Sequence, residues 1–311
     1  MGKQAVLLLA HGTPETVEQI PEYLGNVTGG RALPHEVIEE IQRRYALIGH
    51  SPLPEITIEQ GRLVEAELVA AGEPVPVYVA MRNWHPYIAD VVRQMRADGV
   101  EEAAVLCLAP QNSRTSVGLY RRAVEAEAGR VRIDFTSGWA RHPLLIEAFA
   151  ERLRPAWTRL SAEAGAPVPV LFTAHSVPCR TIQCAEGRSA DPYAEEAKRT
   201  AALVAARVPE IPQWFFAFQS QGVSGGPWIG PTVEETLEAI AASGVRTILL
   251  QPIGFLCDHV EILYDVDILF RGFAARLNLR LERPESLNAS ATLAKAVADL
   301  ARQGLARLNS R

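Results

Sequence analysis

The stretches "VLLLAHGTP" (Val6–Pro14) and "VLFTAHSVP" (Val170–Pro178) are nearly the same phrase, and they stand in opposite halves of the chain. Each is a short apolar run that ends in a histidine, His11 or His175, followed three residues later by a proline. Short apolar runs bounded by turn residues are typical of buried β-strands. The repetition indicates a chain made of two related halves that begin with equivalent strands.

Further apolar runs alternate with longer helical patterns in both halves. The runs lie at 5–10, 75–81, 102–110 and 131–137, and again at 168–174, 214–220, 246–252 and 277–284. Continuous apolar strands separated by helices predict parallel sheets that are covered on both faces. The sequence therefore predicts an α/β protein of two similar Rossmann-like halves, each with a four-stranded parallel sheet flanked by helices.

The domain boundary is expected near the middle of the 311-residue chain, with an N-terminal half at 1–140 and a C-terminal half at 141–311. The last helix, at about 289–311, is a candidate to pack back on the N-terminal half. In open parallel sheets, ligands bind beyond the carboxyl ends of the strands, where His11 and His175 are predicted to lie. We expect an active-site cleft between the halves. The alternative for either histidine is a strand-end residue that caps a backbone carbonyl.

Composition excludes some classes of function. The net charge of −5 and the pI near 5.9 disfavour nucleic acid as a partner, because phosphate binding needs a basic face. The apolar run before His11 is too short for a secretory signal or a membrane span. We expect a cytoplasmic protein without an integral membrane segment, and nothing in the sequence demands more than a monomer.

The cysteines are too sparse for a disulfide scaffold, and reduced thiols are the favoured interpretation; they are Cys107, Cys179, Cys184 and Cys257. Cys179 and Cys184 have C-x4-C spacing, but no second pair completes a four-ligand metal site. The Gly-rich stretch "FAFQSQGVSGGPWIGPT" (216–232) fits neither dinucleotide nor P-loop spacing, and its Trp228 suggests an apolar wall.

The stretch "QPIGFLCDHVEILYDVDILF" (251–270) places acids among large apolar residues. On a helix Glu261 and Asp265 would share a face, with Asp258 one turn earlier. Like charges at this spacing repel each other unless a cation compensates them. One interpretation is a solvated acidic helix start, favoured by the helix dipole. The other, which we prefer, is a metal path or proton acceptor.

With these motifs in view, the chain resembles the ferrochelatase family. The resemblance rests on "FTAHSVP", "FQSQGVSGGPWIGPT" and "PIGFLCDHVEILYDVDI", supported by "HGTP", "RRYALIGHSPL" and "LAPQNSRTSVGLY", in family order over nearly the whole chain. It implies chelatase-type halves around a porphyrin cleft, with His175 and Glu261 as catalytic residues that face each other at the metal-insertion site. Asp265 would continue the metal ligands, whereas Leu269 stands where the family often has another acid.

The implied reaction is that of a lyase in haem biosynthesis, which inserts Fe(II) into a porphyrin and releases two protons. Neutral imidazole and carboxylate suit Fe(II), whereas a thiolate would hold the ion too firmly. Porphyrin and ferrous iron are the expected partners, with coproporphyrin III favoured over protoporphyrin IX. No permanent cofactor is expected. Some relatives hold an iron–sulfur cluster through cysteines mostly near the C-terminus, but no cysteine follows Cys257 here, so no cluster is expected either. The alternatives are a cobalt or nickel chelatase for sirohydrochlorin and a non-catalytic haem-binding protein.

The resemblance also implies contacts to the porphyrin, each equally explicable as a solvated or capping residue. The candidates are His11, Arg31, Arg44, Tyr45, Ser51, Ser113 and Trp228. Short bacterial relatives have tyrosine at the position of His11, and a histidine there could ligate the iron from the opposite face. Thr28 and Gly29 stand where such relatives have two further arginines, so Arg31 alone remains in that loop.

Overall fold

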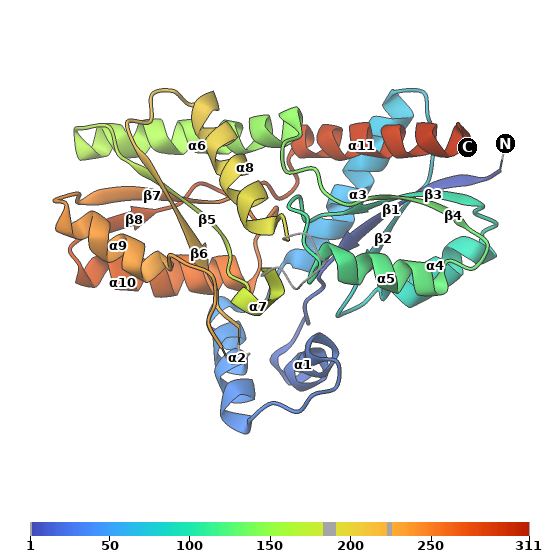
Figure 1. The fold of residues 1–311 in the computed structure, drawn as a ribbon, viewed down its shortest axis with the longest axis horizontal. Coiled ribbons are helices and arrows are strands. Elements are labelled where there is room, and N and C mark those ends of the chain that lie inside the picture. Colours follow the sequence, from blue (N-terminus) through green and yellow to red (C-terminus); the bar gives the residue numbers. More distant parts are fainter. Residues whose placement is uncertain (1, 183–190, 223–225, 311) are drawn as a thin grey trace. The chain divides into compact units, whose positions relative to one another are not determined.

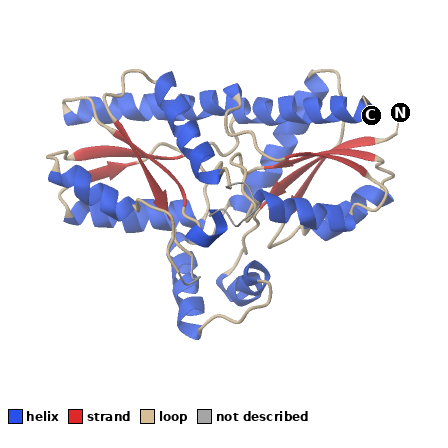
Figure 2. Ribbon diagram, viewed as in Figure 1, coloured by secondary structure: helices blue, strands red, loops and turns tan. Residues whose placement is uncertain are grey.

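The computed structural model describes residues 2–182, 191–222 and 226–310, and Cys184 lies outside these ranges. The chain divides into two compact units. The first comprises Met1–Trp139 together with Asn288–Arg311, and the second comprises Ala140–Leu287. Each unit contains one parallel sheet with helices on both faces (Figures 1 and 2), as the alternating pattern of the sequence predicts.

The first unit is built on a four-stranded sheet in the order β2-β1-β3-β4. The strands are β1 (Gln4–Ala10), β2 (Val77–Met81), β3 (Glu102–Cys107) and β4 (Arg132–Thr136). The helices are η1 (Val17–Gln19), α1 (Ile20–Thr28), α2 (His35–Ile48), α3 (Leu53–Ala70), α4 (Ile88–Ala97), α5 (Val117–Glu127) and α11 (Ala291–Asn309). Leu7 and Leu9 pack with Val92 of α4 and Val124 of α5, while α3 and α11 cover the other face (Figure 1).

The second unit repeats this plan with the strand order β6-β5-β7-β8. Its strands are β5 (Val170–His175), β6 (Trp214–Gln219), β7 (Thr247–Pro252) and β8 (Arg280–Glu282). Its helices are α6 (Pro143–Ala164), α7 (Cys179–Ile182), α8 (Tyr193–Arg207), α9 (Val233–Ala242), η2 (Glu261–Phe270) and α10 (Arg271–Arg276). The equivalence of the two strand orders confirms the predicted fold class. β8 is shorter than the run 277–284 predicts, because Asn278 has a positive φ of 55° and Pro284 cannot donate to a sheet.

The helix after β7 differs from the expected α-helix. Residues Glu261–Phe270 form a π-helix, the class of helix whose amides bond to carbonyls five residues earlier, and α10 continues from its end. Glu261 and Asp265 remain about one turn apart. The helix begins only at Val260, so Asp258 lies before it and not one helical turn below Glu261, which corrects that prediction.

The last helix, α11, completes the first unit by packing on α3, β3 and β4. Its apolar face is buried along its length, through residues such as Val297, Ala301 and Leu308. Arg307 donates to both carboxylate oxygens of Asp134 on β4, with its Nη2 2.7 Å from Oδ2. A fork-shaped pair of this kind fixes direction as well as distance. Residues from the end of the chain thus hold the edge of a sheet that begins at its start.

None of the helices formed by the described residues combines the length and the apolar character that crossing a bilayer requires.

Candidate active site

All four strands of the second sheet contribute polar residues at its carboxyl edge. His175 is the last residue of β5 and Gln219 the last of β6. The Asp258–Asp267 segment follows β7, and Arg283 follows β8. Parallel strands bring their carboxyl ends to one edge, so residues that are far apart in the sequence, such as His175 and Glu261, meet there.

His175 and Glu261 face each other at this edge. Nδ1 of His175 lies 3.6 Å from Oε2 of Glu261, and the two side chains are 32% and 33% exposed. Among the described residues, no group lies within hydrogen-bond distance of this buried Nδ1. The backbone carbonyl of His175 accepts a hydrogen bond from the hydroxyl of Tyr193 at 2.8 Å. The backbone of His175 is thus held by a hydrogen bond, whereas its ring is only loosely paired.

A second imidazole contacts the same carboxylate oxygen. Nε2 of the buried His259 lies 3.5 Å from Oε2 of Glu261, while its Nδ1 donates to the carbonyl of Cys257 at 3.0 Å. Since a carbonyl oxygen only accepts, Nδ1 carries a proton, and in the neutral ring the lone pair of Nε2 points at the carboxylate. Nε2 of His259 and the carboxylate oxygen of Glu261 are thus two acceptors that face each other. The sequence pattern does not indicate this contact, although His259 is only two residues from Glu261.

Asp265 joins a separate hydrogen-bond network at the same edge. The hydroxyl of Ser220 donates to Oδ2 of the buried Asp265. Gln219 donates to the carbonyl of Glu261 at 3.3 Å and accepts from Thr173 at 2.5 Å. Among the described residues, no group of three His, Cys, Asp or Glu side chains is arranged to hold a metal ion. The metal role of Asp265 therefore stays a prediction.

Two further ionisable groups beside the pair stay neutral. Burial, and then the neighbouring charge of Asp258, raise the pKa of the Cys257 thiol to about 12. Burial and the charge of Glu261 raise the pKa of the Tyr193 hydroxyl well above its ordinary value. A thiol with such a pKa is not a thiolate near pH 7, so the Cys257 sulfur does not compete with the oxygen and imidazole donors.

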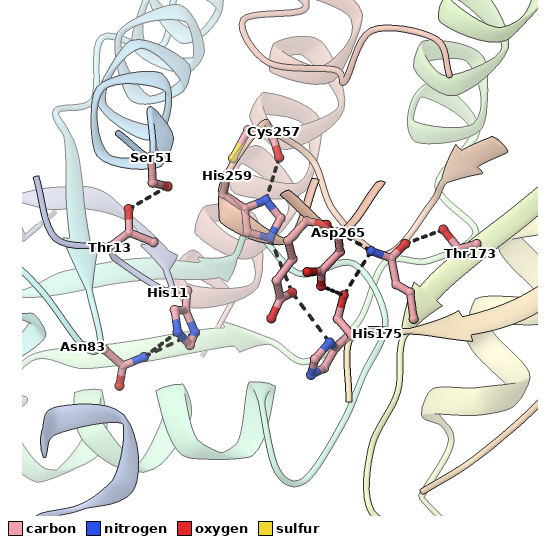
Figure 3. Close-up of polar contacts among 12 residues, drawn as sticks. His11, Thr13, Ser51, Asn83, Thr173, His175, Cys257, His259 and Asp265 are labelled. Carbon is pink, nitrogen blue, oxygen red and sulfur yellow. Dashed lines mark hydrogen bonds and ion pairs between the residues drawn. The ribbon is translucent and has the colours of Figure 1, made fainter. Parts of the chain in front are cut away.

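His11 occupies the equivalent position at the carboxyl edge of the first sheet. Its Nε2 lies 2.9 Å from the hydroxyl of Tyr23, and the amide nitrogen of Asn83 lies 3.2 Å from Nδ1 and 3.1 Å from Nε2. Figure 3 shows the Asn83 contact. Asn83 follows β2, the neighbour of β1, and the sequence analysis did not single it out. The ring is therefore oriented by side chains from two elements.

The charged porphyrin-contact candidates are exposed or half-exposed. Arg31 is exposed, and its carbonyl accepts from the hydroxyl of Thr28 at 2.7 Å. Arg44 forms an ion pair with Glu40, with 3.0 Å between Nε and Oε1. Tyr45, on the same helix, is buried. The two guanidinium groups are therefore accessible to an anionic ligand.

The remaining candidates are mostly buried. Ser51 accepts from the hydroxyl of Thr13 at 3.0 Å, and Ser113 lies 3.1 Å from the hydroxyl of Thr115. Both serines are within the interior of the first unit. Trp228 is half-buried and belongs to the second unit, where its backbone pairs with Pro178 in a single bridge.

Arg82 is a cation that the sequence analysis missed. It follows β2 directly, and its guanidinium lies 5.4 Å from the centre of the Tyr120 ring. Its Nε is buried and has no hydrogen-bond partner among the described residues. Burial raises the pKa of Tyr120 strongly, so the phenol does not serve as an anion to Arg82. A buried guanidinium donor without a partner is suited to an anionic ligand.

Comparison with known proteins agrees with this arrangement. The family model described as Ferrochelatase matches residues 3–305. A protein of Acidobacterium capsulatum named Ferrochelatase is 58% identical over 99% of this chain and 96% of its own length. One of Mycolicibacterium vanbaalenii named Coproporphyrin III ferrochelatase is 36% identical over 96% of this chain and 89% of its own.

A solved structure shows the same fold. The sirohydrochlorin chelatase SirB from Bacillus subtilis superposes with a TM-score of 0.56 over 97% of this chain and 95% of its own, at 14% identity. That likeness concerns the fold alone. The match of the family model along nearly the whole length, together with the 58% identity, shows the relationship that the strand-end histidines suggest. The chain belongs to the ferrochelatase family.

Proposed function

We propose that the chain is a lyase that inserts Fe(II) into a porphyrin with release of two protons. The observation that carries the proposal is the contact of one oxygen of Glu261 with two imidazoles, at 3.6 Å for His175 and 3.5 Å for His259. Metallation removes two pyrrole protons while the ion loses its water ligands, so it needs a base near neutrality beside exchangeable ligands.

In this proposal His175 and Glu261 are the catalytic residues and act on ion and proton in turn. The half-exposed imidazole of His175 takes the two pyrrole protons one after the other and passes each to the carboxylate of Glu261 across the 3.6 Å contact. The carboxylate shares each proton with Nε2 of His259 and, because its side chain is 33% exposed, releases it to solvent before the next one arrives. Imidazole and carboxylate bind Fe(II) as a substrate without retaining it, and the buried Asp265 is the next carboxylate along the helix.

Coproporphyrin III is the porphyrin that we favour. It carries four carboxylates, and the chain offers Arg31 and Arg44 as accessible cations and Arg82 as a half-buried one whose Nε is buried. The Mycolicibacterium vanbaalenii relative is named for this substrate. Tyr45, Ser51, Ser113 and Trp228 are the proposed neutral contacts. We further propose that the enzyme acts as a monomer and holds no resident cofactor or iron–sulfur cluster.

We also propose that His11 ligates the iron of the product. Tyr23 and Asn83 orient its ring, which limits the freedom that a ligand must lose on binding. Titration of the His11→Ala variant with the iron porphyrin should alter the visible spectrum relative to the parent protein. An unchanged spectrum would refute the assignment.

Anaerobic incubation with Fe(II) tests the function. Coproporphyrin III, protoporphyrin IX and sirohydrochlorin are supplied in turn, and metallation is followed by absorbance. We expect insertion into coproporphyrin III, and loss of it in His175→Ala but not in His35→Ala, which changes an exposed histidine paired with Glu39. Metallation of sirohydrochlorin alone would favour the other chelatase class, and binding without any metallation would favour a haem-binding protein.

A further inference from the structure

The charges of the segment before and along the π-helix are divided between two kinds of partner. The ten residues from Asp258 to Asp267 carry four carboxylates, which are those of Asp258, Glu261, Asp265 and Asp267. Glu261 contacts the imidazoles, and Asp265 accepts from Ser220. The outer two, Asp258 and Asp267, both contact the guanidinium of Arg283, which follows β8.

Arg283 binds the two carboxylates in different ways. Its Nε and Nη2 donate to the two oxygens of Asp267, each at 2.8 Å, which is the fork geometry that lysine cannot reproduce. Its Nη2 also lies 3.2 Å from Oδ1 of Asp258, and that oxygen accepts from Ser286 at 2.7 Å. The remaining nitrogen, Nη1, donates to the carbonyl of Pro284 at 3.1 Å. The guanidinium therefore joins two points of one segment to the end of β8.

This ion cluster is largely shielded from water. The side chain of Arg283 is only 11% exposed, and those of Asp258 and Asp267 are 19% and 23% exposed. Burial alone would lower the pKa of Arg283, but hydrogen bonds and charges from Asp267 and then Asp258 outweigh it and raise the pKa. Shielded, well-aligned pairs restrict geometry more than exposed ones do, because solvent does not compete for them.

The two carboxylates that Arg283 binds lie on either side of His259 and Glu261 in the sequence. Asp258 lies directly before His259, and Asp267 lies two residues after Asp265. The guanidinium thus holds the chain on both sides of His259 and Glu261. The i to i+5 hydrogen bonds of a π-helix are rare and less favourable than the bonds of an α-helix. Such a helix therefore needs stabilising contacts with neighbouring elements.

We propose that Arg283 is a positioning residue that holds Asp258 and Asp267 and thereby fixes His259 and Glu261 opposite His175. The role rests on the proposed function, since its purpose is to place the groups that move the proton and the ion. Without the guanidinium, Asp258 and Asp267 would lose the cation that they share, and of the ion pairs described here Asp267 would keep only the longer contact with the exposed Arg271. The start of the π-helix would then shift, and a shift of about 1 Å in a catalytic group costs as much as 100-fold in rate.

The test compares three variants by the kinetics of anaerobic metallation. Arg283→Gln removes charge and fork, and we expect kcat to fall by about tenfold or more while KM for the porphyrin stays within about twofold. Arg283→Lys restores the charge without the fork and should recover only part of kcat. Arg271→Gln is the matched control, because Arg271 touches the same Asp267 at 3.6 Å from an exposed position, and its kcat should not change.

Hydrogen exchange gives a second readout that needs no turnover. In Arg283→Gln the amides of 258–270 should exchange about tenfold faster, while those of α6 keep their rate, because the lost restraint is local. If Arg283→Gln does not fold, Asp258→Asn and Asp267→Asn each remove one contact and should show the same local acceleration with reduced kcat.

Two results would overturn the proposal. One is an Arg283→Gln protein with unchanged kcat. The other is an acceleration of exchange spread evenly over the second unit, which would mean general destabilisation. If the parent protein metallated no porphyrin, the proposed function would fail, and the exchange data would still decide whether Arg283 holds the segment.

Discussion

At the scale of single residues, the contact between His175 and Glu261 predicts that the two act as one unit. His175→Ala and Glu261→Gln should each lower kcat by about 10²- to 10³-fold, the usual worth of a positioned acid–base group. Because both variants interrupt the same transfer, the double variant should be no slower than the slower single variant. Initial rates of anaerobic metallation measure this, and losses that multiply in the double variant would show independent roles.

Tyr78 gives a prediction for stability at alkaline pH. Its hydroxyl donates to Asp98 at 2.6 Å, and burial together with this carboxylate raises its pKa to about 12. An unfolded tyrosine ionises near pH 10, so between about pH 10 and 12 the unfolded chain binds fewer protons than the folded one. The free energy of unfolding should therefore fall as the pH rises through this range.

The Tyr78→Phe variant isolates that contribution. Near neutral pH it should be about 1 kcal/mol less stable than the parent, for want of the hydrogen bond. The difference in the free energy of unfolding between the two proteins should shrink between about pH 10 and 12, because only the parent has a hydroxyl at residue 78 that can lose its proton. Denaturant unfolding at a series of pH values measures both, and a difference that stays constant up to pH 12 would contradict the assignment.

The sequence predicts some residues of the site and misses others for a physical reason. His175 ends an apolar run and Glu261 stands in an acidic helix, so both can be recognised from their immediate neighbours. Ser220 and Arg283 can be recognised only when the strand order is known, because their partners lie on other strands. A periodic pattern gives the edge at which a residue lies but not the group that it contacts.

At the scale of elements, the contact of α11 with β3 requires a glycine. A Cβ at Gly304 would lie 2.9 Å from the Cβ of Ala104 and 3.3 Å from a carboxylate oxygen of Asp134. Alanine is normally the better helix former by about 1 kcal/mol, but here the overlap is with a rigid strand. Gly304→Ala should therefore lower the free energy of unfolding by about 1–3 kcal/mol.

Gly272 in α10 is the matched control for Gly304, because a Cβ added there would have no neighbouring atom within 4 Å. Gly272→Ala should raise the free energy of unfolding by about 0.5–1 kcal/mol, the ordinary helix preference. Thermal or denaturant unfolding of both variants gives the comparison. Equal effects in the two positions would mean that α11 does not approach β3 closely.

The π-helix shows where prediction of an element stops. Its residues predict a helix with two acids on one side, and the structure has them. The sequence does not reveal the wider hydrogen-bond register, because apolar spacing at four residues suits both kinds of helix. The sequence also does not reveal that Asp258 lies before the start of the helix, or that its partner is Arg283, which follows β8.

At the scale of the whole molecule, the repeated phrase predicts two equivalent sheets, and both have the same order of strands. The two units nevertheless differ in how the chain enters them. The second is one continuous segment, Ala140–Leu287, whereas the first needs both Met1–Trp139 and Asn288–Arg311. An apolar pattern is local, so it does not reveal that a compact unit is built from two segments that are far apart in the sequence.

This division predicts how fragments behave. A fragment of residues 140–287 should fold alone and unfold in one cooperative transition, because its core is complete. A fragment of residues 1–139 should not, since the loss of α11 would leave the apolar surface of β3 and β4 exposed. Adding a peptide of residues 288–311 should restore cooperative unfolding of the 1–139 fragment. Circular dichroism during thermal unfolding measures this, and a stable 1–139 fragment would contradict it.

The position of α11 also bears on synthesis of the protein in the cell. A chain leaves the ribosome from its N-terminus, and domains usually fold in that order. Here the first unit waits for residues 288–311, so the second unit can become native while the first is still incomplete. The strands β1 to β4 emerge early and must avoid aggregation until residues 288–311 have been synthesised. Chaperone binding to the nascent chain should therefore concentrate on its first 139 residues.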